Sequence, residues 1–381
     1  MNFTFKGLKN QSYTNLPEIK NFGMSETPTL KTSKNNFSKW VEHLNCSTPN
    51  LSKLPEIKPF NGRRLETTQT LPNILLTDRA IPRLNPSTVS NSSFGKIKAY
   101  AANTHQGLTR IYNEDKAMII LKIKNTSHPA KKIWTDCSFF GLYDGHGGKA
   151  CSNFLRDNLH HYIINDHFFP ESPKQAILRG FAQAEIDFLN VARDTGEKSG
   201  SCALVVLIIG KICYVANLGD SRAVMSGSQG QQVFTITRDH KPNDPDEQAR
   251  IQLQGGKIYF NSSSPNKIYR VLPGRLSVSR TFGDIDAKNA DFGGNPNVLI
   301  AIPEIKSFKI KKQHDFIVMG CDGIFDVMSS KDVVTTVWES NKKSEDLASN
   351  SCRNAVEAII SQSMKKRSND NLTAIIIAFW I

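Results

Sequence analysis

Four aspartates of this chain lie at the boundary of an apolar run. Three follow such a run and stand beside a glycine, and the fourth precedes the last apolar run; in chain order they are Asp144, Asp220, Asp322 and Asp370. A single aspartate next to a glycine is an ordinary turn signal. Four of them at strand ends predict a site for divalent cations. Strands that meet at one edge of a sheet would bring the carboxylates together, and divalent cations would relieve the repulsion between them.

The types of ligand indicate which cation such a site would hold. Carboxylate oxygens without a group of thiolates or histidines favour Mg²⁺ or Mn²⁺ over Zn²⁺ or copper. Gly145 follows Asp144 directly, and a glycine lets its own backbone carbonyl approach a metal closely. The residues alone therefore predict a hard-cation site built from oxygen ligands.

The elements that would position these aspartates lie between about Phe94 and Ile381. Seven apolar runs in this region are typical of strands, at residues 118–123, 137–143, 203–209, 212–216, 233–237, 316–321 and 372–380. Apolar residues three and four apart predict amphipathic helices near residues 150–159, 177–188 and 355–360. Because near-continuous apolar strands are buried on both faces, we expect an α+β fold of two packed sheets with helices outside, an α-β-β-α layering.

Residues 1–93 differ in composition, being rich in Asn, Ser, Thr, Pro and Lys without helical or alternating periodicity. We expect a disordered or loosely attached tail, followed by one folded domain over residues 94–381. Within the tail the sequence LPEIK occurs twice, at residues 16–20 and 54–58. Chance repetition in a biased sequence is the simpler explanation; the alternative hypothesis is a pair of short docking motifs for a partner, since apolar anchors can fill a groove.

The formal net charge of +13 raises the possibility of nucleic-acid binding. Residues 1–90 carry 12 Lys and Arg against 6 Asp and Glu, so about half of the surplus lies in a quarter of the chain. No stretch interleaves these cations with aromatic residues, which favours a solvated, mildly basic tail over a nucleic-acid site. A nucleic-acid function would predict salt-sensitive binding to DNA or RNA.

The seven cysteines are scattered and form no CxxC pair or disulfide framework. The start of the chain is polar, and the longest apolar run, Ala203–Ile209, is too short to span a bilayer. We therefore expect a soluble intracellular protein, in the cytoplasm, the nucleus or both, and a monomer.

Seven motifs carry a resemblance to a known family. In chain order they are RIYNED (110–115), DGHGG (144–148), NLGDSR (217–222), RDHKP (238–242), LSVSRTFGD (276–284), CDGIFDVM (321–328) and NDN (369–371). Over residues 94–381 the chain resembles the metal-dependent protein phosphatases of the 2C type, the PPM family. The resemblance implies an antiparallel β-sandwich flanked by helices, and the removal of phosphate from phosphoserine and phosphothreonine residues of proteins.

The resemblance also implies roles for individual residues. Asp144 would bridge two Mg²⁺ or Mn²⁺ ions, and Gly145 would bind one of them through its backbone carbonyl. Asp115 and Asp284 are expected to have supporting roles. The segment of about 243–275 is expected to form a flap beside the cleft. The other implied ligands are Asp322 and Asp370 on one ion, Glu114 through water on the other, and Asp220 and Asp326 at a possible third ion.

The expected reaction is direct attack of water on the phosphate monoester, because two metals sharing Asp144 would acidify a bridging water. Arg110 would hold two phosphate oxygens with its planar guanidinium, although an ordinary surface ion pair is the alternative for this residue. His146 would protonate the departing serine or threonine oxygen, a role worth about 10²–10⁴ in rate, although a lone histidine is more often structural. No CxxxxxR sequence is present, so a phosphocysteine route has no support.

One departure from the family pattern is Cys202, which stands where the family usually has threonine in Gly-Ser-Thr-Ala. We expect it on a strand, with a small packing effect and no metal role. The departure leaves a second hypothesis open, in which the chain is a phosphatase-like scaffold that binds phosphoproteins without turnover.

Overall fold

The computed structural model describes residues 82–90, 92–124, 136–260, 267–341 and 348–379. The chain divides into two units, 1–35 and 36–381. The first unit lies outside the described residues, and every helix and strand named below belongs to the second. The two LPEIK repeats also lie outside the described residues.

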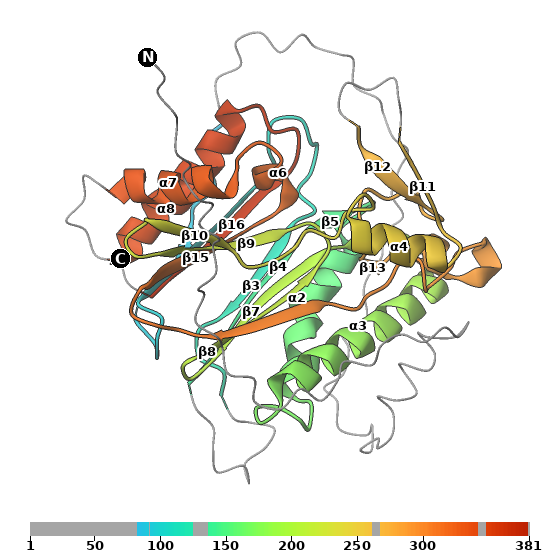
Figure 1. The fold of residues 1–381 in the computed structure, drawn as a ribbon, viewed down its shortest axis with the longest axis horizontal. Coiled ribbons are helices and arrows are strands. Elements are labelled where there is room, and N and C mark those ends of the chain that lie inside the picture. Colours follow the sequence, from blue (N-terminus) through green and yellow to red (C-terminus); the bar gives the residue numbers. More distant parts are fainter. Residues whose placement is uncertain (1–81, 91, 125–135, 261–266, 342–347, 380–381) are drawn as a thin grey trace, which may run out of the picture. The chain divides into compact units, whose positions relative to one another are not determined.

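Two antiparallel sheets form the centre of the fold (Figure 1). The first has six strands in the spatial order β1 (Thr88–Val89), β2 (Ala99–His105), β16 (Leu372–Ala378), β15 (His314–Gly320), β9 (Arg222–Gly227) and β10 (Gln232–Thr235). The second has five, in the order β14 (Glu304–Lys309), β8 (Ile212–Leu218), β7 (Ala203–Ile209), β4 (Cys137–Tyr143) and β3 (Lys116–Ile120). The antiparallel sheets predicted from the resemblance are confirmed.

The side chains of β4 show why the sheets stack. Phe140 and Leu142 belong to the core cluster that contains the strands of the six-stranded sheet, whereas Phe139 and Tyr143 belong to the cluster that contains the helices α2 (Ala150–Ile164) and α3 (Pro173–Thr195). Successive side chains of a strand point to opposite faces. One face of β4 is therefore buried against the six-stranded sheet and the other against the helices. All seven residues of β4 are buried.

Helices cover the outer face of each sheet. The pair α2 and α3 packs on the five-stranded sheet, and the pair α7 (Ser330–Asn341) and α8 (Ala348–Lys365) packs on the six-stranded sheet. The four layers α-β-β-α predicted from the sequence are therefore confirmed (Figure 1). Among the described residues, no helix combines the length and apolarity needed to cross a bilayer.

Short elements connect the layers at one edge. A three-stranded sheet contains β13 (Phe282–Gly283), β6 (Gly200–Ser201) and β5 (Gly145–His146), and the four-residue helix α6 is Asp322–Phe325. The region expected to form a flap holds α4 (Pro245–Leu253) and a hairpin of β11 (Lys257–Phe260) and β12 (Tyr269–Leu272), followed by α5 (Ile285–Lys288) and the 3₁₀ helix η2 (Ala290–Phe292). Asp244 caps α4 by accepting hydrogen bonds from the backbone N–H groups of Asp246 and Glu247.

Part of the segment assigned to the tail belongs to the six-stranded sheet. Strand β1 pairs with β2, with Thr88 opposite Ala102. Asn103 on β2 donates hydrogen bonds from Nδ2 to the Asn85 carbonyl and to Ser87 Oγ, at 2.7 and 2.9 Å. Residues just before the expected boundary at 93/94 thus contribute to the folded unit.

Candidate metal centre

Three aspartates predicted from the sequence converge at one edge of the two sheets. Asp144, Asp220 and Asp322 each offer a carboxylate oxygen, and these oxygens lie within 4.8 Å of one another. Asp144 follows β4 and Asp220 comes soon after β8, both of the five-stranded sheet, whereas Asp322 follows β15 of the six-stranded sheet. Ends of strands from both sheets therefore contribute to one group.

The electrostatics of this group fit a cation. Burial raises the pKa of Asp144 well above its ordinary value, and the negative charges of Asp322 and Asp115 raise it further. Burial likewise raises the pKa of Asp322, with further contributions from Asp220 and Asp370. Carboxylates that are buried or half-buried and repel one another are stabilised by a hard divalent ion, and oxygen-only donors are what Mg²⁺ and Mn²⁺ prefer.

Asp370 and Arg110 lie beside this group and bind each other. Arg110 Nη2 lies 2.6 Å from Asp370 Oδ2, and the two side chains are 46% and 32% exposed. Arg110 Nε also donates to the Asn369 carbonyl at 3.4 Å. The residue expected to hold phosphate thus forms an ion pair at the rim of the carboxylate group.

Glu114 and Gly145 pack against each other. Glu114 is 5% exposed; its Oε1 accepts a hydrogen bond from the Gly148 N–H at 2.5 Å, and its backbone N–H donates to Asn371 Oδ1 at 2.9 Å. A Cβ added at Gly145 would meet the Glu114 carbonyl oxygen at 2.7 Å and Ser152 Oγ at 2.8 Å. Only glycine fits between these groups, which is a steric reason for the residue after Asp144.

Asp115 connects the start of β3 to β16. Its Oδ2 accepts a hydrogen bond from Thr373 Oγ1 at 2.7 Å, and Thr373 Oγ1 lies 2.8 Å from Thr104 Oγ1 on β2. Burial raises the pKa of Asp115 to about 6. The side chain is 2% exposed, so its place is behind the group and not at its surface.

His146 is held by Asp284. Its Nε2 lies 2.9 Å from Asp284 Oδ2, and among the described residues Nδ1 has no hydrogen-bond partner. Burial disfavours the charged imidazole, but the charge and hydrogen bond of Asp284 outweigh burial and raise the pKa of His146. A Cβ at Gly200 would meet Asp284 Oδ2 at 2.0 Å and His146 Nε2 at 2.4 Å, so the pair depends on a glycine in β6.

Asp326 lies at the end of α6 and is 59% exposed. Lys241 Nζ lies 3.3 Å from Asp326 Oδ1 and 3.7 Å from Asp220 Oδ2. Lys241 belongs to the RDHKP motif, yet no role for it was predicted from the sequence. The signal that could have found it is a cation within the same set of ordered motifs as the aspartates.

Cys202 lies closer to the site than the sequence predicted. It stands between β6 and β7 instead of on a strand, and its Sγ lies 3.5 Å from Asp220 Oδ1. Its backbone N–H donates to the Asp144 carbonyl at 2.8 Å. The expectation that Cys202 lies on a strand is therefore wrong, and its thiol lies beside Asp220 of the carboxylate group. The small packing effect and the absence of a metal role stay predictions.

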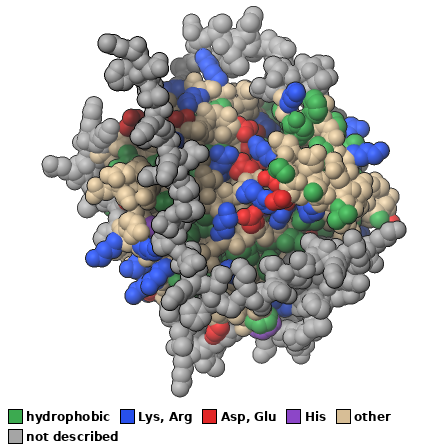
Figure 2. Space-filling model, in the orientation of Figure 1, with side chains coloured by type: hydrophobic (Ala, Val, Ile, Leu, Met, Phe, Trp, Pro, Cys, Tyr) green, Lys and Arg blue, Asp and Glu red, His purple; other side chains and the backbone are tan. Residues whose placement is uncertain are grey.

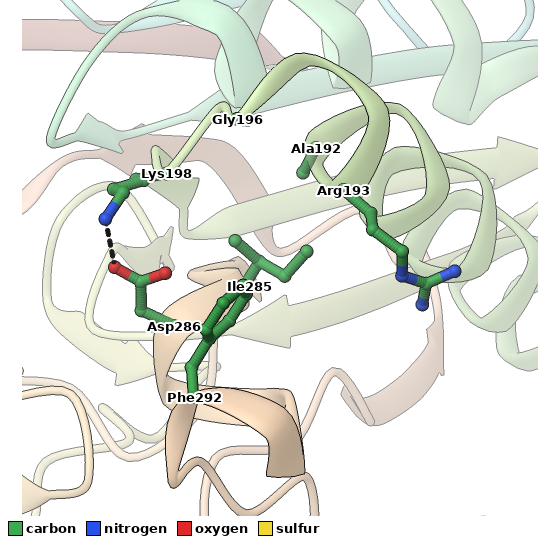
Figure 3. Close-up of a pocket in the computed structure, with 7 residues that line it drawn as sticks. All are labelled: Ala192, Arg193, Gly196, Lys198, Ile285, Asp286 and Phe292. Carbon is green, nitrogen blue, oxygen red and sulfur yellow. Dashed lines mark hydrogen bonds and ion pairs between the residues drawn. The ribbon is translucent and has the colours of Figure 1, made fainter.

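The groove drawn in Figure 3 is lined by none of the predicted site residues. It has a volume of about 300 Å³ and is lined by Ala192, Arg193, Gly196, Lys198, Ile285, Asp286 and Phe292. Two of these residues, Lys198 and Asp286, form an ion pair of 2.7 Å between Nζ and Oδ2. Ile285 and Asp286 directly follow Asp284, the residue that holds His146.

The surface in Figure 2 has charges of both signs near its middle. Acidic side chains gather there with Lys and Arg beside them. This mixture of charges differs from the one-sided basic patch that is typical of nucleic-acid binding.

The family model for protein phosphatase 2C matches residues 107–372. The chain belongs to the protein phosphatase 2C family. The matched segment contains every predicted site residue, and the resemblance stated from the motifs is confirmed.

Curated members of the protein phosphatase 2C family are similar over most of this segment. The chain is 32% identical to probable protein phosphatase 2C 27 of Arabidopsis thaliana over 268 residues, which cover 70% of this chain and 66% of the relative. It is 35% identical to probable protein phosphatase 2C 54 of Oryza sativa subsp. japonica over 246 residues, which cover 64% of this chain and 62% of the relative. The chain thus spans just under two thirds of the length of these relatives.

Solved structures share the fold. A serine-threonine phosphatase 2C from Toxoplasma gondii matches with a TM-score of 0.61 and 21% identity, over 77% of this chain and 99% of that one. A sex determining protein of C. elegans matches with a TM-score of 0.61 and 20% identity, over 74% of this chain and 64% of that one. At these identities the likeness concerns the fold.

Proposed function

We propose that this chain is a protein serine/threonine phosphatase that uses two Mg²⁺ or Mn²⁺ ions. The observation that carries the proposal is the convergence of three carboxylates, Asp144, Asp220 and Asp322, within 4.8 Å of one another. Membership of the protein phosphatase 2C family supports phosphoserine and phosphothreonine proteins as substrates.

The residues that would hold the cations are the three carboxylates of this group and the further ligands that the resemblance implies. They are Asp144 as the shared ligand, Asp322 and Asp370 on one ion, the Gly145 carbonyl and Glu114 through water on the other, and Asp220 and Asp326 at a possible third. When bound, the cations supply Lewis-acid chemistry, which turns water into a nucleophile at neutral pH and neutralises charge on the phosphoryl oxygens. The protein contributes the fixed arrangement of donors.

Arg110 binds the phosphate group in this proposal. A guanidinium has five N–H donors, and Nη2 and Nε are engaged by Asp370 and Asn369. Three N–H donors remain, two on Nη1 and one on Nη2. Arg110 can therefore hold two phosphoryl oxygens end-on through Nη1 and Nη2 while it stays paired with Asp370.

His146 gives a proton to the departing oxygen of serine or threonine. Asp284 holds Nε2 at 2.9 Å, which fixes the orientation of the ring and leaves Nδ1 as the donating atom. Asp284 also favours the protonated imidazole that an acid must be before the transfer. Asp284 is thus a positioning residue for His146.

A metal-dependence assay tests the proposal against the scaffold hypothesis. We expect phosphate release from a phosphothreonine peptide with Mn²⁺ and essentially none with excess chelator, and we expect Asp144→Asn to abolish the Mn²⁺-dependent release. A scaffold would instead bind the phosphopeptide, as seen by fluorescence anisotropy, with no release under either condition. That result would contradict the phosphatase proposal and favour the scaffold hypothesis.

A further inference from the structure

The ammonium group of Lys241 lies between two carboxylates of the site. Lys241 Nζ lies 3.3 Å from Asp326 Oδ1 and 3.7 Å from Asp220 Oδ2. The Asp220 side chain is 4% exposed, whereas those of Lys241 and Asp326 are 36% and 59% exposed. The ammonium group therefore reaches from the surface to a buried member of the carboxylate group.

The backbone before Lys241 is fixed to the backbone before Asp220. The His240 N–H donates to the Gly219 carbonyl at 2.9 Å, and the Gly219 N–H donates to His240 Nδ1 at 3.1 Å. His240 is fully buried. Two hydrogen bonds at a buried histidine thus determine where the Lys241 side chain starts, so that its pairing with Asp220 follows from the fold.

The nearby Arg222 pairs with a carboxylate outside the group. Arg222, in the same NLGDSR motif as Asp220, forms an ion pair of 2.6 Å with Asp239. Among the described residues, no lysine or arginine forms an ion pair with Asp144 or Asp322. The positive charge that the chain itself supplies is therefore unequal around the site: Lys241 forms ion pairs with Asp220 and Asp326, and it acts on Asp322 only from beyond ion-pair distance.

This asymmetry has a direct consequence for cation binding. A divalent ion between Asp220 and Asp326 must displace the ammonium group or lie beside it and be repelled, and both effects lower its affinity. A lysine ammonium is a mobile point charge on a flexible stem, so it weakens such a position without closing it.

We propose that Lys241 is a built-in competitor that keeps the cation position at Asp220 and Asp326 weak, so that this position fills only at high divalent-ion concentration. The inference rests on the proposed function, because it requires that the carboxylate group bind divalent cations. The inference goes beyond the proposed function because it assigns to Lys241 the order in which the cation positions fill.

Binding of Mn²⁺ to the full-length chain tests the inference without an activity assay. Isothermal titration calorimetry, together with the free-Mn²⁺ signal in electron paramagnetic resonance, gives the number of ions bound and the affinity of each step. For Lys241→Met we expect the weakest step to tighten by on the order of tenfold, with the tighter steps unchanged. Lys241→Arg keeps the charge and should resemble the unaltered protein.

Lys366→Met is the matched control. Lys366 is 37% exposed and lies 3.0 Å from Asp332, an ion pair of similar exposure that involves none of the site residues. This variant should bind Mn²⁺ as the unaltered protein does. In the double variant Lys241→Met with Asp326→Asn, the tightening of the weakest step should be lost.

The outcomes separate this inference from the proposed function. If Lys241→Met binds Mn²⁺ with unchanged affinities, or loses the tighter steps, the competitor role is wrong while the phosphatase proposal stands. If the unaltered protein binds no Mn²⁺ at all, the proposed function itself fails. Circular dichroism of each variant establishes that it is folded before the titrations are compared.

Discussion

At the scale of the residue, repulsion among carboxylates links function to stability. Without cations, Asp144 is a half-buried group whose pKa is raised by burial and by the charges of Asp322 and Asp115. Such a charge destabilises the folded state at neutral pH, because the folded state holds the carboxylate in a less favourable environment than the unfolded chain does.

Asp144→Asn should therefore have opposite effects on activity and on stability. We expect loss of at least about 10² in Mn²⁺-dependent phosphatase rate, since the proposed shared ligand is removed, together with a higher melting temperature in the presence of chelator. Differential scanning calorimetry in chelator measures the second effect, with Asp332→Asn, at an exposed ion pair, as the control. A lower melting temperature for Asp144→Asn would contradict the account of repulsion.

The pair of His146 and Asp284 makes a prediction about leaving groups. His146→Ala and Asp284→Asn should lower the hydrolysis of a phosphothreonine peptide by about 10–10³-fold, because a serine or threonine oxygen must be protonated as it leaves. Hydrolysis of p-nitrophenyl phosphate should fall much less, since its leaving group is stable as an anion. Rates on both substrates, measured for each variant, give the comparison; equal losses would remove His146 as the acid.

At the scale of the element, the small sheet of β5, β6 and β13 keeps this pair together. Gly200→Ala would place a Cβ 2.0 Å from Asp284 Oδ2, so we expect a loss of stability of about 1–3 kcal/mol from overpacking and a loss of phosphatase rate. Gly196→Ala is the control: nothing lies within 4 Å of its added Cβ, although φ is +73°. It should lose about 1 kcal/mol of stability with an unchanged rate. Chemical denaturation and phosphate release measure the two effects, and equal rate losses would contradict a specific role of Gly200.

Long apolar elements were predictable from the sequence, whereas short or polar ones were not. The run 203–209 coincides with β7, because six of its seven residues are buried between two layers. Strand β2 was missed: its sequence, AYAANTH, is small and polar, yet it pairs with β16 along its whole length. β2 forms a strand because it pairs with β16, and the local sequence of β2 does not reveal that pairing.

The site was predictable to the same extent. Asp144, Asp220 and Asp322 could be proposed as a group because each stands at the end of an apolar run that becomes a strand. The contacts of Lys241, Cys202 and Gly200 with these residues and with His146 could not, because they join segments far apart in the chain. Long-range contacts of this kind depend on the packing of layers and not on spacing in the sequence.

At the scale of the whole molecule, a second charged network should control acid stability. Glu247 is 1% exposed and binds Arg280 and Arg250. Burial alone would raise its pKa, but the hydrogen bond with Arg280 and the charges of both arginines lower it below the ordinary value of 4.5. The stabilisation is therefore complete above pH 4.5 and is lost as the pH falls below it, because only the unfolded chain then takes up the proton.

Glu247→Gln should destabilise the protein by about 3 kcal/mol near neutral pH, because two guanidinium groups that are only 19% and 13% exposed lose their charged partner. The difference in unfolding free energy between the two proteins should shrink as the pH falls below 4.5. Urea denaturation over a series of pH values measures it. A difference that stays constant as the pH falls well below 4.5 would contradict the assignment of the lowered pKa to Glu247.

The aspartates of the site come from different layers: Asp144 and Asp220 from the five-stranded sheet, Asp322 and Asp370 from the six-stranded sheet. Any ion that they share is consequently a crosslink between the halves of the sandwich, in the same sense as a disulfide but reversible. Amide hydrogens near the ends of β8 and β15 should then exchange with solvent more slowly, and in concert, once the crosslink forms. The concentration of free divalent ions would in this way set the rigidity of the sandwich at that edge as well as the rate of its chemistry.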